Sequence, residues 1–418
     1  MTFSLVSIAR VSAAIAVVAG CHGAAHAQEP APQEITMGSF GATRVNPRQR
    51  QTLTFSLNSA AAIDRDTSVA GTAGPFGGPH ANIRGGLTYR RQHRSGVFSI
   101  NAGSGLQHYP GRERVSAANH SLDASFSTTL GRHTQLQLSQ RAIQSPFFMV
   151  SAGALSGFET FRWTNTALTT NVGVTQALGR RASVAISYGS QQMRMVAGRF
   201  ASQTVGAGYH HQLSRYATAR VGYSRLMVAR QSGSTAMESR VRQRHDIDLG
   251  VDYNRPLSLT RRTTLAFRSG SSLVPSNGRT HLQLAGGASL SREIGRSWTA
   301  ALDYGRHVQL VEALDEPLIA DTVSLSLRGA PVRRLNLSAS ASMSIGQVGF
   351  GSGDREYETQ LAAVRARWTF HRFLALYADS SYYRHAFGAA VAIAPGIQLN
   401  ADRREVRIGL MTWVPLLH

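Results

Sequence analysis

From Leu335 to Ile345 the chain reads Leu-Asn-Leu-Ser-Ala-Ser-Ala-Ser-Met-Ser-Ile, with every odd position apolar and every even position serine or asparagine. Only an extended strand turns a period of two into two distinct faces. At roughly 3.4 Å per residue the stretch is about 35 Å long, whereas strands of water-soluble proteins usually hold about 5–6 residues. A tilted transmembrane strand of about 9–11 residues or slightly more accounts for this length. The stretch therefore predicts a membrane-spanning β-strand.

The same alternation recurs along the chain, so the predicted fold class is all-β. Apolar and polar residues alternate again in 246–253, 322–328, 363–370 and 405–410. After residue 30 no run of about 18 apolar residues occurs, which is the length that a membrane helix needs. A charge on the lipid face costs about 2–4 kcal/mol near the bilayer midplane, so the charged residues of these stretches are expected to face a lumen.

Short turns and longer loops divide the chain into hairpins. Eight short turns, each with at least one arginine, lie about 35 to 48 residues apart, which leaves room for two strands and one longer loop. The turns are expected near His93-Arg94-Ser95, Gly131-Arg132, Gly179-Arg180-Arg181, Ser214-Arg215, Arg261-Arg262, Gly295-Arg296, Arg333-Arg334 and His371-Arg372. The longer loops are expected near 71–79, 144–157, 231–239, 346–355 and 386–400.

The turn count predicts the architecture. Eight turns join sixteen strands, and a first strand at Gln51–Ile63 and a last at Arg403–Val414 bring the total to 18, with 16 to 18 as the range. Short turns on one side and long loops on the other are typical of bacterial outer-membrane barrels, in which the short turns are periplasmic. We therefore predict a single antiparallel up-and-down transmembrane β-barrel.

The N-terminal segment indicates export. An apolar run from Val11 to Gly20 precedes the small-residue site Ala25-His26-Ala27, which is the order of a secretory signal peptide. We expect a signal peptide at 1–27, a short periplasmic segment at 28–48 and the barrel at 49–418. A second processing site stays open, because Val18-Ala19-Gly20-Cys21 looks like a bacterial lipobox, in which the cysteine becomes lipid-modified.

Aromatic residues gather close to the expected short turns. Such rings form girdles at the two membrane interfaces of outer-membrane barrels. The residues concerned are Tyr89, Tyr209, Tyr216, Tyr253, Trp298, Trp368, Phe370, Phe373 and Trp413.

Taken together, the alternating strands, basic turns and aromatic girdle resemble the porin-like outer-membrane β-barrels of Gram-negative bacteria, over about residues 49–418. The resemblance is architectural. It implies an outer-membrane location, contact with outer-membrane lipid and lipopolysaccharide, and insertion by the barrel-assembly machinery. Trimers are common among such barrels, so a homo-trimer is an open expectation. The chain departs from many members at its end, which reads Trp413-Val414-Pro415-Leu416-Leu417-His418 and lacks a terminal aromatic residue.

The excess of basic over acidic residues suggests which ions a lumen would prefer. Lysine is absent, so all 44 basic residues are arginines, against 23 acids. A barrel of 16 to 18 strands leaves an aqueous channel, and rings or ladders of arginine suit anion pores. The expected pore-lining residues are Arg220, Arg328, Arg365, Arg367, Arg407, Asp246, Asp248, Asp252 and Asp303. An equally open alternative is that these arginines form structural ion pairs with lumenal acids, including Asp123 and Asp379.

Other functional classes have weaker support. The arginines are spread over the whole length, which disfavours nucleic-acid binding. A catalytic site is not expected, since no Gly-X-Ser-X-Gly motif occurs and His120-Ser121 and His245-Asp246 point to opposite faces of their strands. With a single cysteine we expect no Cys-based metal cluster, and neither a cofactor nor a metal site is predicted.

Two functional hypotheses remain, with an outer-membrane hydrolase as a minor third. The first is an outer-membrane channel for passive diffusion of small, preferentially anionic solutes. In that case the loop with Phe147, Phe148 and Met149 is the candidate constriction. The second is a barrel component of polysaccharide or surface-polymer export or assembly, which would favour an aromatic or acidic track along the lumen.

Overall fold

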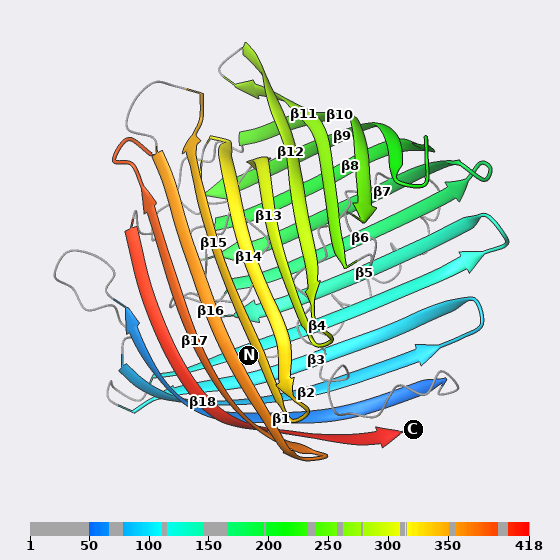
Figure 1. The fold of residues 1–418 in the computed structure, drawn as a ribbon. Helices are drawn as coiled ribbons and strands as arrows, with labels where there is room; N and C mark the ends of the chain where they lie inside the picture. The colour runs from blue at the N-terminus through cyan, green and yellow to red at the C-terminus, as the bar shows by residue number, and fades with distance from the viewer. Residues whose placement is uncertain are drawn as a thin grey trace, which may run out of the picture.

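A single closed β-sheet makes up the structure. The computed structural model describes residues 50–66, 78–110, 115–145, 165–195, 198–232, 240–256, 262–276, 279–309, 314, 316–350, 356–391 and 400–417. Within them, eighteen strands form one sheet, and each strand is antiparallel to its neighbours along the chain. The last strand pairs with the first, so the sheet closes into a barrel (Figure 1). The predicted fold class and the total of 18 strands are confirmed.

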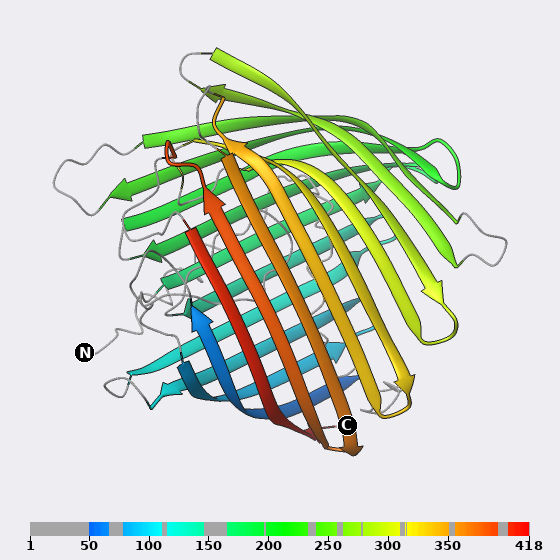
Figure 2. The same ribbon diagram turned by 60° about the vertical axis from the view of Figure 1, so that its left-hand side comes forward.

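The strands are long and tilted, as a second view shows (Figure 2). Their bounds are β1 Gln51–Asp66, β2 Gly78–Gln92, β3 Gly96–Tyr109, β4 Val115–Leu130, β5 Thr134–Ser145, β6 Asn165–Ala177, β7 Ala182–Met195, β8 Gly198–Gln212, β9 Ala217–Ser232, β10 Arg240–Pro256, β11 Thr263–Ser276, β12 Arg279–Ile294, β13 Trp298–Gln309, β14 Leu318–Val332, β15 Leu335–Val348, β16 Glu356–His371, β17 Leu374–Phe387 and β18 Asn400–Leu417. The first and last strands run up to three residues past their predicted ends, because β1 and β18 pair along almost their whole length.

Strand β15 shows the two faces that its sequence predicts. Met343 and Ile345 are 40% and 55% exposed, whereas Ser344 between them is 3% exposed. The Ser344 hydroxyl lies 2.8 Å from that of Thr322 on β14. The exposed apolar residues of the other strands share a face with Met343 across the paired ladders, which makes that face the outside of the barrel.

Most short turns lie where they were predicted. Seven of the eight fall within the described residues, and in the eighth only Arg262 is described. Gly131 and Gly295 begin two of these turns with φ of 70° and 64°, a left-handed conformation that favours glycine. On the opposite end the connections are less uniform than predicted, because only two residues separate β7 from β8 and β11 from β12. The predicted signal peptide at 1–27, the predicted 28–48 segment and most of the predicted long loops lie outside the described residues.

The aromatic girdle is largely on the outer face. Tyr89 packs edge-on against Phe98, Tyr253 stacks with Phe267, and Trp368 contacts Phe370. Trp413 is the exception, because it pairs with Ser56 on the inner face and is only 3% exposed. Placing Trp413 in the girdle was therefore wrong; its position in the alternation of β18 opposes the outward Val414.

An apolar cluster fills part of the interior at the long-loop end. It joins Leu318, Val348, Tyr357 and Phe387 from four inner strand faces, together with Leu314 and Val391 from connections. Tyr357 and Leu318 are each 1% exposed. Among the described residues, no helix is long and apolar enough to cross a membrane.

Candidate functional site

The candidate site is the inner wall of the barrel. All nine residues expected to line a pore lie on the inner face, in register with buried polar side chains and opposite the exposed apolar ones. The structure separates them into two groups. Arg328, Arg365, Arg367 and Arg407 lie on β14 to β18, and Arg220 lies with Asp246, Asp248 and Asp252 on β9 and β10. Asp303 lies on β13, and the constriction-loop residues Phe147, Phe148 and Met149, like Cys21, are outside the described residues.

A chain of alternating charges crosses the wall formed by β16, β17 and β18. An Arg365 nitrogen lies 3.0 Å from Asp379, which in turn lies 3.5 Å from Arg407. Arg407 donates to Glu405 at 2.7 Å.

The chain continues from Glu405 to a third arginine and to β2. Arg403 approaches Glu405 at 3.7 Å, and His80 Nε2 lies 3.6 Å from the same carboxyl group. Arg367 lies beside the chain on β16 and is 8% exposed. This wall therefore holds four arginines against two acids, so it carries a positive excess.

Arg220 occupies a break in the sheet. The pairing of β10 with β11 is interrupted between Ile247 and Tyr253. Over this interval β10 contains two residues more than the facing stretch of β11. The Arg220 guanidinium lies over this break and bonds to Asp248 at 2.8 Å and to Asp252. It also donates to the carbonyl oxygen of Ser269 on β11 at 2.9 Å. Arg220 thereby supplies donors where the ladder supplies none.

A second cluster on β10 surrounds Asp246. Arg244 donates twice to this carboxylate, at 3.0 and 2.8 Å, and the hydroxyl of Ser272 also donates to it. Ser224 lies 3.5 Å away on β9. On β4 and β5, Asp123 and Arg141 form a more exposed pair at 3.2 Å.

The ion pairs decide between the two interpretations of the arginines only in part. Arg220, Arg365 and Arg407 are paired, as the structural alternative expects. Arginines nevertheless outnumber carboxylates among the inner-face side chains that the structure describes on the paired strands. The arginines there are Arg84, Arg90, Arg141, Arg220, Arg244, Arg268, Arg279, Arg328, Arg365, Arg367, Arg403 and Arg407, and the acids are Asp123, Asp246, Asp248, Asp252, Glu293, Asp303, Asp379 and Glu405.

The chain forms a closed β-barrel of 18 antiparallel strands, with an apolar outside and a charged inside. This architecture resembles that of porin-like outer-membrane β-barrels. No family model matches this barrel, and no curated protein matches its sequence.

Several solved structures are similar to this barrel. OccK11 (OpdR) of Pseudomonas aeruginosa has a TM-score of 0.47 at 13% identity, over 88% of this chain and 96% of that chain. OpdQ of the same species has a TM-score of 0.47 at 9% identity, over 88% and 98%. The siderophore receptor PirA from Pseudomonas aeruginosa has a TM-score of 0.44 at 9% identity, over 88% and 81%.

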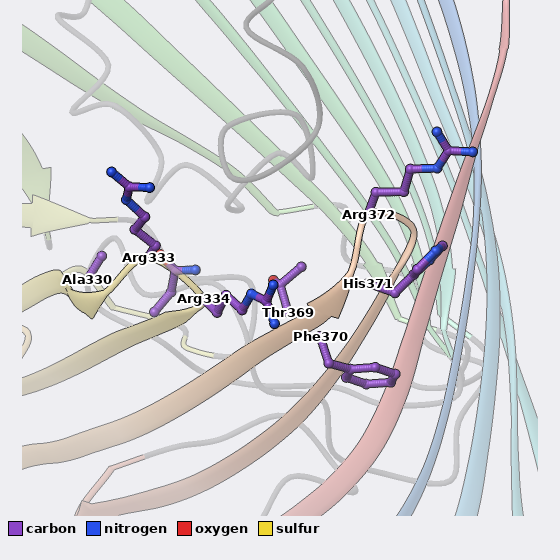
Figure 3. A pocket seen from close by; sticks show the side chains of 8 residues that line it. Ala330, Arg333, Arg334, Thr369, Phe370, His371 and Arg372 are labelled. Atoms are coloured by element: carbon purple, nitrogen blue, oxygen red, sulfur yellow. The ribbon is translucent and has the colours of Figure 1, made fainter.

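A basic cavity lies at the short-turn end of the barrel (Figure 3). Its volume is about 290 Å³, and Arg333, Arg334, His371 and Arg372 line it together with Ala330, Asn336, Thr369 and Phe370. Figure 3 shows Arg333 and Arg372 on opposite sides, with Arg334 extending towards Thr369. No carboxylate is among the lining residues. The cavity therefore presents cationic groups at one mouth of the barrel.

Sequence reasoning missed three charged or ionisable residues of these clusters, namely His80, Arg244 and Arg403, whereas Glu405 lies on the inner face where the alternation of 405–410 placed it. A signal for Arg403 was present, because it shares the alternation of Arg407 along β18. His80 and Arg244 lie close to strand ends, where alternation is short. In the described part of the barrel no group of three or more His, Cys, Asp or Glu side chains is arranged to hold a metal ion.

Proposed function

We propose that the barrel is a channel for passive diffusion of small solutes and that it prefers anions. The observation that carries the proposal is the excess of arginine over carboxylate on the described inner wall, concentrated on β16 to β18. Charge lining a cleft with low-dielectric walls focuses the field and raises the local concentration of counter-ions. The cavity lined by Arg333, Arg334 and Arg372 extends this positive potential to the mouth at the short-turn end.

Polymer export is the second candidate, and the inner wall offers it less support. A polymer path would present exposed aromatic faces on which sugar rings could stack. On the described inner wall the tyrosine, phenylalanine and tryptophan side chains are at most 8% exposed; they are Phe200, Tyr357, Tyr377, Tyr383, Phe387 and Trp413. These rings pack within the wall and do not form an exposed track.

The test is single-channel recording of the refolded barrel in planar bilayers, with the reversal potential measured across a potassium chloride gradient. Stable conductance steps are expected, with a reversal potential shifted from zero towards the equilibrium potential of chloride. A folded, heat-modifiable barrel that gives no steps would contradict the channel. Steps with cation preference would contradict the anion preference alone.

A further inference from the structure

Hairpin β11–β12 leaves the sheet at the long-loop end. Strand β12 pairs with β13 only from Gly286 to Ile294, so Arg279–Ala285 pairs with β11 alone. The departure begins at a pair of glycines. A Cβ at Gly286 would stand 2.8 Å from the Arg268 carbonyl oxygen, and one at Gly287 would stand 2.8 Å from that of Tyr304. Side chains there would force the strands apart, so glycine allows the close crossing.

The described end of the hairpin, Leu273–Val274 and Arg279–Ala285, is called the tip here, and it lies against the outside of β13 and β14. Val274 belongs to the inner face of β11, yet it packs with Val308 and Ile319 from the outer faces of β13 and β14. The His281 ring, also from an inner face, stacks on Phe350 at 3.9 Å with an interplanar angle of 5°. Figures 1 and 2 show the tip standing beyond the ends of its neighbours. The end of this hairpin therefore overlaps the outside of the neighbouring wall and is not paired with it edge to edge.

A seam results between β12 and β13, where Arg279–Ala285 does not pair with β13. A single side chain bridges this seam. Arg244, on the inner face of β10, donates to the carbonyl oxygen of Val308 on β13, although β11 and β12 separate these strands in the sheet. The same guanidinium donates to Asp246. Each backbone polar group without a hydrogen bond costs several kcal/mol in hydrocarbon. Arg244 satisfies one carbonyl group of β13 at the place where β12 does not pair with that strand.

The two sides of the seam differ in chemistry. Outside it, Leu282 and Leu284 are 62% and 72% exposed on β12. Inside it lie the cation of Arg244 and the hydroxyl-rich surroundings of Asp246. The seam starts beside Arg306, which is paired with Asp321 at 3.6 Å on the outer face. A molecule with an apolar chain and an anionic head matches this order of groups, with the chain on the leucines and the head at Arg244.

We propose that the tip of hairpin β11–β12 is a lateral gate, through which an anionic amphiphile passes between the outer leaflet and the lumen. The stacked rings of His281 and Phe350 and the contacts of Val274 hold the gate closed. Opening moves the tip off β13 and β14, and Arg244 exchanges the Val308 carbonyl for the anionic head. The proposal rests on the open lumen proposed above and adds a second, lateral route to it.

The test is a reversible lock. His281→Cys and Phe350→Cys are introduced together with Cys21→Ser, and the barrel is reconstituted in liposomes loaded with decyl sulfate or methyl sulfate. Both probes carry the same permanent charge and differ only in the chain. Oxidation is expected to slow decyl sulfate release severalfold and to leave methyl sulfate release and conductance unchanged, and reduction is expected to restore the rate.

The matched control places Gln191→Cys and Ser202→Cys on the continuous β7–β8 ladder at the same end of the barrel. This lock is expected to change neither rate. Unchanged decyl sulfate release in the oxidised 281–350 variant would overturn the gate, and so would equal slowing of both probes, because that would mean one shared route. Loss of methyl sulfate release and conductance in the unmodified barrel would instead contradict the channel.

A second variant tests the gate if the double cysteine variant does not fold. Val274→Ala weakens the packing on Val308 and Ile319 that holds the gate closed and leaves Arg244 in place, so the seam should open more often. The ratio of decyl sulfate to methyl sulfate release is then expected to rise severalfold. An unchanged or lower ratio in a folded barrel would contradict the proposal.

Discussion

The guanidinium of Arg220 on β9 donates a hydrogen bond to the carbonyl oxygen of Ser269 on β11, 2.9 Å away and on the far side of β10. Such a reach is possible because Gly250, the residue of β10 paired with Arg220, has no side chain. The same guanidinium holds Asp248 and Asp252 on the two sides of that glycine. Arg220 is therefore a structural member of the wall as well as a charge within it.

Replacing Arg220 by alanine is expected to destabilise the barrel. The change leaves two carboxylates and a carbonyl without their shared donor, and hydrogen bonds to charged groups contribute about 1.5–3 kcal/mol each in favourable cases. Because the carboxylates are more than a third exposed, we expect a loss of only about 1–3 kcal/mol in the free energy of unfolding. Urea titration in lipid vesicles measures it.

Two comparisons make the Arg220 result specific. Arg328→Ala removes an exposed inner-face arginine from β14 and should leave stability nearly unchanged. Arg220→Lys keeps the charge but cannot match the planar fork of donors, so it should rescue only part of the loss. Equal stability of the Arg220→Ala and Arg328→Ala variants would show that the break in β10 does not depend on Arg220.

Ion selectivity should respond in opposite directions to the two partners Asp379 and Arg365. Asp379→Asn leaves the positive wall with less compensation and should raise the chloride-to-potassium permeability ratio, whereas Arg365→Gln should lower it. A unit charge about 8 Å from a passing ion contributes about 0.5 kcal/mol in water, equal to a factor of about 2. Reversal potentials of both variants measure the effect, and shifts of the same sign would contradict the assignment.

The two faces of β15 can be distinguished with a single charge. Ala341 lies on the outer face between Leu325 and Ala362, and Ser340 lies on the inner face between Ser326 and Ala363. Ala341→Arg is expected to reduce folding stability in bilayers by about 2–4 kcal/mol, and Ser340→Arg by much less. The refolded fraction on a heat-modifiability gel and urea titration both report the difference. A larger loss for Ser340→Arg would mean that the faces are reversed.

Packing inside the barrel can be tested with two leucines of β14. Leu318 is 1% exposed in the inner apolar cluster, whereas Leu325 is 53% exposed on the outer face. Leu318→Ala should cost about 2–5 kcal/mol because it opens a cavity among fixed neighbours. Leu325→Ala leaves no enclosed cavity, since lipid can fill the space, and should cost less. Comparable losses in vesicle unfolding would contradict a packed interior at the long-loop end.

The alternation of side chains was enough to predict much of the barrel. In β15, β14, β16 and β18 the period of two decides which residues share a face, because successive Cβ atoms of a strand point to opposite sides. Gly131 and Gly295 marked turns that need a left-handed backbone. Trp413 was misplaced because aromatic residues near a strand end were taken as interfacial, although its position relative to Val414 already put it on the inner face.

Sequence by itself thus determined the all-β class, the number of strands and the inner face on which Arg220, Arg365 and Arg407 lie, since these depend on local period and turn residues. The register of β1 against β18, the charge chain from Arg365 to His80 and the overlap of hairpin β11–β12 with β13 and β14 were decided only in the tertiary structure. The physical reason is that these contacts join residues on strands distant in the chain. Their distances depend on register, tilt and the two-residue break in β10, which no local pattern encodes.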